Sequence, residues 1–199
     1  VSGSFPLTEG PNTLTAETTD PAGNTGTGSG VTTLDTGLPA IAVSGPSGLI
    51  NNDSPSITGT TDQPNGATVT VTITGPTNDT CNATVNAGTW SCAAGPLTDG
   101  SYNISATTTD TAGNSATATG SFTLDATDPV VAISGPALTN DPTPTVNGTT
   151  DQPDGSTVTL KNSGGDTLCS AIVTSGAWSC TVSGSFPLTE GPNTLTAET

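Results

Sequence analysis

The chain repeats itself at fixed spacing, and this constrains its fold more than any other feature. Residues 1–18 recur without a change as residues 182–199, so the period is 181 residues (182 − 1). A weaker repeat of half that length lies inside it: the string G-T-T-D-Q-P begins at residue 59 and again at residue 148, 89 residues later. Fixed spacing of this kind is typical of arrays that use one small domain many times. The fold must therefore be small enough to form within a single unit of the shorter repeat.

The repeat divides the chain into one whole unit and two partial ones. A Leu-Asp pair closes the unit at residues 34–35 and again at residues 124–125, 90 residues further on. We therefore predict the C-terminal part of a repeat at 1–35, a complete repeat at 36–126, and the N-terminal part of a third at 127–199. Both ends of the sequence fall inside a repeat.

Alternation of apolar and polar residues predicts strands in every unit. In the segment 67–73, Val69, Val71 and Ile73 point to one side and the threonines between them to the other. Residues 40–124 contain seven such short strands, separated by turns rich in Gly, Pro, Asn and Asp. Seven strands in one unit predict an all-β fold of tandem immunoglobulin-like sandwiches, with the aliphatic side chains in the core.

The four cysteines form one pair in each of two units. Both pairs are 11 residues apart: Cys81 with Cys92, and Cys169 with Cys180. A hairpin that turns at residues 86–87 would place Cys81 opposite Cys92, with Trp90 on the same inward face. A disulfide closing so short a loop contributes about 2–3 kcal/mol. The alternatives are metal sites or free thiols, but two Cys per unit without any His are too few for zinc. We predict two disulfides and a secreted location, where disulfides persist.

Charge and motif content exclude several classes of function. One lysine stands against 17 acidic residues, a net charge of −16, which repels nucleic acid and anionic membrane surfaces. No segment approaches the ~20 apolar residues that a membrane span requires. The sequence has no His, no G-x-S-x-G and no Gly-rich phosphate loop. We expect neither membrane insertion, nor nucleic-acid binding, nor catalysis.

Five strings occur in order along the complete unit and its linker. They are G-T-T-D-Q-P-N-G-A-T-V-T-V, A-G-T-W-S-C, L-T-D-G-S-Y, T-T-D-T-A-G-N and L-D-A-T-D-P-V-V. In sequence and spacing they resemble the bacterial Ig-like repeats found in tandem in giant secreted adhesins of Gram-negative bacteria. The resemblance covers the whole chain. It implies an extender region that holds an adhesive tip away from the cell, in many members with calcium between successive domains.

Acidic residues gather at the predicted loops and junctions, where oxygen-rich clusters suit calcium. Asp is also common in turns for its own backbone geometry, and that alternative stays open for each single residue. Carried over residue by residue, the resemblance implies two sets of calcium ligands. At the second junction they would be Asp110, Asn114, Asp125 and Asp128. At the first they would be Asp20, Asn24 and Asp35, and Leu38 stands where the fourth ligand would be, so we expect weaker binding there.

Two functions remain. In the first, the chain is a structural repeat of a bacterial cell-surface adhesin, a non-catalytic stalk rigidified by disulfides and inter-domain calcium. Its partners are then neighbouring copies of the repeat, and any ligand of the tip lies outside this sequence. In the alternative, the repeats form the structural subunit of a multi-chain extracellular filament, sheath or matrix that packs through its Thr-rich faces.

Overall fold

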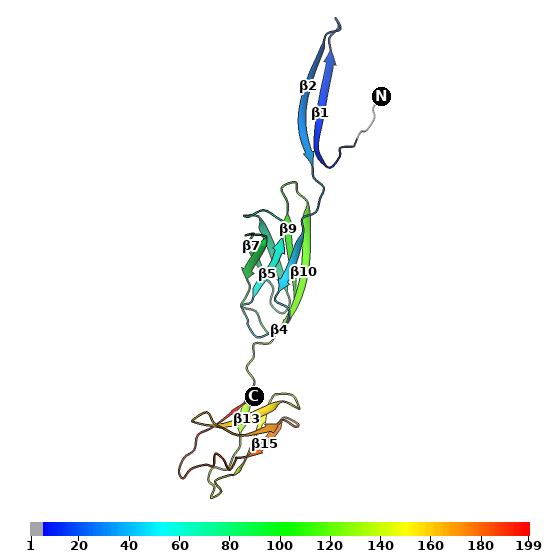
Figure 1. Cartoon of the computed structure of the whole chain (residues 1–199). Coiled ribbons are helices and arrows are strands. Elements are labelled where there is room, and N and C mark those ends of the chain that lie inside the picture. The colour runs from blue at the N-terminus through cyan, green and yellow to red at the C-terminus, as the bar shows by residue number, and fades with distance from the viewer. Residues whose placement is uncertain (1–5) are drawn as a thin grey trace. The chain divides into compact units, whose positions relative to one another are not determined.

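The computed structural model describes residues 6–199, and the regular structure of this part of the chain consists of β-strands (Figure 1). It divides into two compact units, one ending at Ala126 and one running from Thr127 to Thr199. The first contains a two-stranded hairpin and the complete repeat. Within the described residues, no helix is present that could cross a membrane. The all-β prediction is confirmed.

The complete repeat at residues 36–126 is built from two sheets. The larger has the order β4 (Gly48–Ile50), β10 (Ser115–Leu124), β9 (Gly100–Thr109), β6 (Thr68–Thr74), β7 (Asp79–Thr84). The smaller has the order β3 (Ile41–Gly45), β5 (Ser56–Thr61), β8 (Thr89–Ala93). All neighbours are antiparallel except β4 and β10, which run parallel. The sequence had predicted seven of these eight strands and missed β4.

The core of this repeat lies between the inner faces of the two sheets. Val69, Val71 and Ile73 of β6 are fully buried, as their alternation predicted. Tyr102 of β9 and Phe122 of β10 stack with ring centroids 5.1 Å apart. The Tyr102 hydroxyl donates a hydrogen bond to the carbonyl oxygen of Thr98 at 2.7 Å, which satisfies its only polar atom inside the core.

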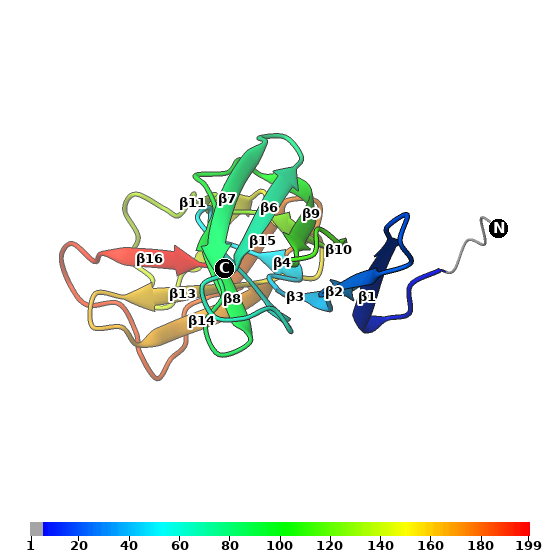
Figure 2. The same cartoon turned by 90° about the horizontal axis from the view of Figure 1, so that it is seen from above.

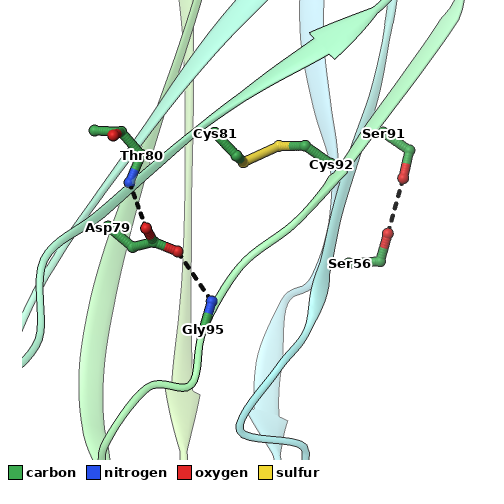
Figure 3. The surroundings of a disulfide bond; sticks show 7 residues. All are labelled: Ser56, Asp79, Thr80, Cys81, Ser91, Cys92 and Gly95. Carbon is green, nitrogen blue, oxygen red and sulfur yellow. Dashed lines mark hydrogen bonds between the residues drawn. A yellow bond between two sulfur atoms is a disulfide. The ribbon is translucent and has the colours of Figure 1, made fainter.

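The predicted cysteine pairs are present, and the chain turns near the predicted position, where Asn86 pairs with Thr89, but the two strands that carry the cysteines do not pair with each other. Cys81 is bonded to Cys92, and Cys169 to Cys180. In the complete repeat β7 pairs with β6 and β8 pairs with β5, so the disulfide joins edge strands of different sheets (Figure 3). Val85 still donates to the Ala67 carbonyl oxygen (2.8 Å), which keeps the chain beside β6 before it crosses to the smaller sheet.

The two partial repeats keep the strand pairing of the complete one. In the N-terminal part, β1 (Gly10–Thr19) and β2 (Thr25–Leu34) form a hairpin in the register of β9 and β10. In residues 127–199, the sheets have the orders β11 (Val131–Ile133), β12 (Thr145–Thr150), β15 (Ala177–Thr181) and β14 (Thr167–Ile172), β13 (Thr157–Asn162), β16 (Leu195–Glu198). Figure 2 shows β16, β13 and β14 side by side. Leu160 of β13 pairs with Ala197 of β16 as Val71 of β6 pairs with Ala106 of β9.

Candidate functional site at the unit junctions

The loop with the sequence D-T-A-G-N connects β9 to β10 at one end of a long hairpin. The two strands pair without a break from Thr109↔Ser115 beside the loop to Gly100↔Leu124 at the far end. Asp125 follows Leu124 and is therefore separated from the loop by the ten residues of β10, about 30 Å at ~3.3 Å per residue. The set predicted for the second junction, Asp110 and Asn114 with Asp125 and Asp128, is thus not brought together.

The D-T-A-G-N loop instead lies beside the linker through which the chain enters the same repeat. The Asn114 side-chain amide donates to the carbonyl oxygen of Asp35 at 3.0 Å and to Asp110 Oδ2 at 2.9 Å. Asp110 Oδ1 accepts hydrogen bonds from three backbone N–H groups of the loop, those of Ala112, Gly113 and Asn114, at 2.8–2.9 Å. Asp110 and Asn114 therefore belong to the first junction, together with Asp35.

The residues predicted for the first junction, Asp20, Asn24 and Asp35, are not brought together either. Asp20 and Asn24 lie in the loop between β1 and β2, and the Asn24 amide donates to Asp20 Oδ2 at 2.8 Å. Asp35 follows the far end of that hairpin, where Gly10 pairs with Leu34. The hairpin therefore keeps Asp20 and Asn24 about 30 Å from Asp35.

Hydrogen bonds keep the two loop carboxylates ionised. The Asn114 side chain holds the pKa of Asp110 below its ordinary value of 3.8, against a smaller rise from desolvation. The Asn24 side chain lowers the pKa of Asp20 in the same way. Because the folded pKa is the lower one, the stabilisation that each ionised carboxylate gives its loop is present above pH 3.8. It is lost as the pH falls through the lowered pKa.

Replacing Asn114 with alanine should raise the pKa of Asp110 towards its ordinary value, since the largest cause of the lowered pKa is removed. Carboxyl carbon chemical shifts followed by NMR through an acid titration would measure it. The pKa of Asp20, whose loop keeps Asn24, should stay low in the same sample and serves as the internal control. An unchanged Asp110 titration would mean that Asn114 does not hold this carboxylate.

The described residues supply only part of a calcium shell. Among them, no group of three or more Asp, Glu, His or Cys side chains is close enough to hold a metal ion. Calcium takes 6–8 oxygen ligands, whereas Asp110 Oδ1 already accepts three N–H groups. Residues 20–24 have no counterpart among residues 127–199, because Thr199 repeats Thr18.

Four further carboxylates contact the linkers, and the sequence analysis missed all of them. They are Glu9, Asp62, Asp99 and Asp151, and each accepts a hydrogen bond from a linker backbone N–H group. Their recurrence could have revealed them: Asp62 and Asp151 are 89 residues apart, and Glu9 and Asp99 are 90 residues apart. Asp occurs so often in turns that recurrence alone was not read as a contact.

Comparison with known proteins identifies the complete repeat. Residues 42–126 match the family model of the bacterial Ig-like domain. A crystal structure of a tetra-tandem repeat in the extending region of a large adhesion protein is 28% identical; the match covers 96% of this chain and 53% of that one, with a TM-score of 0.44. The BSP domain of a biofilm-associated protein is 25% identical over 82% of this chain and 27% of that one, with a TM-score of 0.28.

The chain thus spans about half the length of the first of these structures. A comparison with curated protein sequences finds no match. The strand order, the core and the matched residues agree with one another in the complete repeat, and the flanking segments repeat its sequence. Residues 42–126 are thus identified as a bacterial Ig-like domain.

Proposed function

We propose that this chain is part of the extracellular stalk of a bacterial cell-surface adhesin, a non-catalytic extender that spaces a binding tip from the cell. The observation that carries the proposal is the junction: only six residues, 35–40 or 125–130, separate the last strand of one Ig-like repeat from the first strand of the next. Short connections between domains of the same fold give a chain whose length grows with the number of repeats. The partners of each repeat are its neighbouring copies.

The disulfides and the charge support an extracellular stalk. Each disulfide ties the two sheets of a small sandwich together, and such bonds persist in oxidising compartments. A net charge of −16 makes successive repeats repel one another, which favours an extended chain over a collapsed one.

The outer face of the larger sheet favours a second candidate, the subunit of a multi-chain filament or sheath. Every side chain that β6, β9 and β10 direct away from the core is Ser, Thr or Asn. Such a face lets copies pack side by side without bringing their carboxylates together. Sedimentation over a wide concentration range separates the candidates, because a stalk stays monomeric and a filament subunit assembles.

Calcium belongs to the proposal with a corrected set of ligands. We place it between the acidic linker and the D-x-A-G-N loop of the following repeat, the arrangement that the Asn114–Asp35 hydrogen bond supports. At the first junction the carboxylates are then Asp35 and Asp110. At the second they are Asp125, Asp128 and the repeat's equivalent of Asp20, so this junction has one carboxylate more and should bind the ion more tightly.

The test uses a two-repeat chain in which Thr199 is followed by a copy of residues 19–34, which supplies a counterpart of the loop at residues 20–24. Chelation should broaden the small-angle scattering profile of this chain and lower its melting temperature, because the carboxylates repel one another once the ion is gone. The matched control is Asp128→Leu, which copies Leu38 of the first junction and should respond less. If chelation changes neither quantity, calcium is not a component of the stalk.

A further inference from the structure

We infer that Glu9, Asp62, Asp99 and Asp151 are linker-positioning residues that hold the joints between repeats without a metal ion. The inference rests on the proposed extender function, because only a stalk requires its joints to be held. Each carboxylate is bonded to the backbone of a linker. Together they make two kinds of contact, one where the chain leaves a repeat and one where it enters the next.

The exit contact holds the second residue after the last strand. Glu9 accepts hydrogen bonds from the backbone N–H group (3.0 Å) and the hydroxyl group (2.8 Å) of Thr36. Asp99 accepts one from the backbone N–H group of Ala126 at 2.7 Å. Each acid directly precedes the strand that pairs with the last strand, so the pairs Gly10↔Leu34 and Gly100↔Leu124 bring it beside the departing chain.

The entry contact holds the residue before the first strand from both sides. Asp62 Oδ1 accepts from the N–H group of Ala40 at 3.0 Å, and the Asp62 N–H group donates to the Ala40 carbonyl oxygen at 3.2 Å. Asp151 makes the same two bonds to Val130, at 3.0 and 3.2 Å. The acid is the same in both repeats although the residue it holds differs, because the bonds go to the backbone.

The exit and entry contacts lie close together along each linker. In the first linker, only residues 37–39 lie between Thr36, held at the exit, and Ala40, held at the entry. In the second, only residues 127–129 lie between Ala126 and Val130. Both three-residue segments end in proline, whose ring fixes φ. Hydrogen bonds to an ionised acceptor are stronger than neutral ones, so four carboxylates suffice to restrict both joints.

The test measures hydrogen exchange of the linker amides by NMR in the full chain, both with and without a chelator. Asp151→Ala should speed exchange of the Val130 N–H group by about tenfold, the loss of one charge-assisted bond. Asp151→Asn, which keeps an oxygen acceptor in the same place, should restore most of the protection. Asp154→Ala is the matched control: this acid lies in the same loop and accepts from Ser175 N–H (2.6 Å) instead of from the linker.

Three results would overturn the inference. Val130 exchange could be unchanged in Asp151→Ala, it could rise equally in Asp154→Ala, or chelation alone could abolish the protection of Val130 in the unsubstituted chain. The last result would mean that a metal ion holds the joint. Fluorescence of Trp178, buried in the same repeat, verifies that each variant is folded. A failure of the extender function would show as concentration-dependent assembly in sedimentation and would leave these exchange rates as they are, so the two outcomes are distinguishable.

Discussion

Replacing Trp90 with alanine should lower the free energy of unfolding of the complete repeat by about 3–5 kcal/mol. The side chain is 3% exposed and belongs to the core between the sheets. Its indole N–H group donates to the carbonyl oxygen of Thr60 at 3.2 Å, so the substitution removes a hydrogen bond as well as the largest apolar side chain of β8. The cavity that it leaves adds to the lost burial of apolar surface.

Chemical denaturation followed by circular dichroism measures this loss, and two controls lie in the same chain. Thr70→Ala, on the exposed face of β6, should change the free energy by no more than about 0.5 kcal/mol. Trp178 reports on the other compact unit, so the transition in its fluorescence should stay where it is. Equal small effects at Trp90 and Thr70 would contradict the assignment of the inner and outer faces.

Replacing Gly59 with alanine should cost about 3 kcal/mol or more, at the upper end of the overpacking range. A Cβ atom at this position of β5 would lie 2.0 Å from the carbonyl oxygen of Ala42 and 2.1 Å from Cζ2 of Trp90. The carbonyl belongs to the neighbouring strand β3, which cannot move away without breaking its pairing with β5. The clash therefore has to be relieved by the backbone or by the tryptophan, and both are fixed by packing.

The same measurement with Gly28→Ala supplies the control, because a Cβ atom there meets no atom within 4 Å. We expect Gly28→Ala to be close to neutral. Gly148 of the third repeat is in the position of Gly59, with Trp178 in place of Trp90, and should respond as Gly59 does. A mild effect at Gly59 would mean that the Trp ring does not pack against the strand in the way described.

Most of the fold could be predicted from alternation alone. Side chains on β6 are alternately buried and exposed as read, because a strand between two neighbours in a sandwich has one face in the core. β4 was missed because three residues, Gly48–Ile50, are too short to show a period of two. Its pairing with β10 is a long-range contact that no local pattern contains.

The error at the cysteines has a different origin. The pattern from Cys81 to Cys92 places Ala83, Val85 and Trp90 in the core, and all three are buried. A hairpin and a turn that crosses between sheets give the same inward-facing positions and the same distance along the chain. Only the partners β6 and β5, which lie elsewhere in the sequence, decide between them.

The junction residues were predicted individually and grouped wrongly. Asn114, whose side chain also bonds Asp110, contacts the linker that contains Asp35 and not the one that contains Asp125. The resemblance grouped them with Asp125, whereas the antiparallel hairpin of β9 and β10 places the loop at the opposite end of the repeat. The two ends of a long strand lie far apart because each residue adds about 3.3 Å along its axis.

The parallel pairing of β4 and β10 determines how a complete repeat resists being unfolded by a pulling force. A chain under tension is drawn from Ile41 at one end of the repeat and from Leu124 at the other. Because β4 runs parallel to β10, with Leu124 paired to Ile50, these pulls slide the two strands along each other. Their hydrogen bonds lie across the direction of sliding and are strained together instead of opening one after another. Beyond them, the Cys81–Cys92 bond keeps the segment between the two cysteines from being drawn out even if the sheets separate.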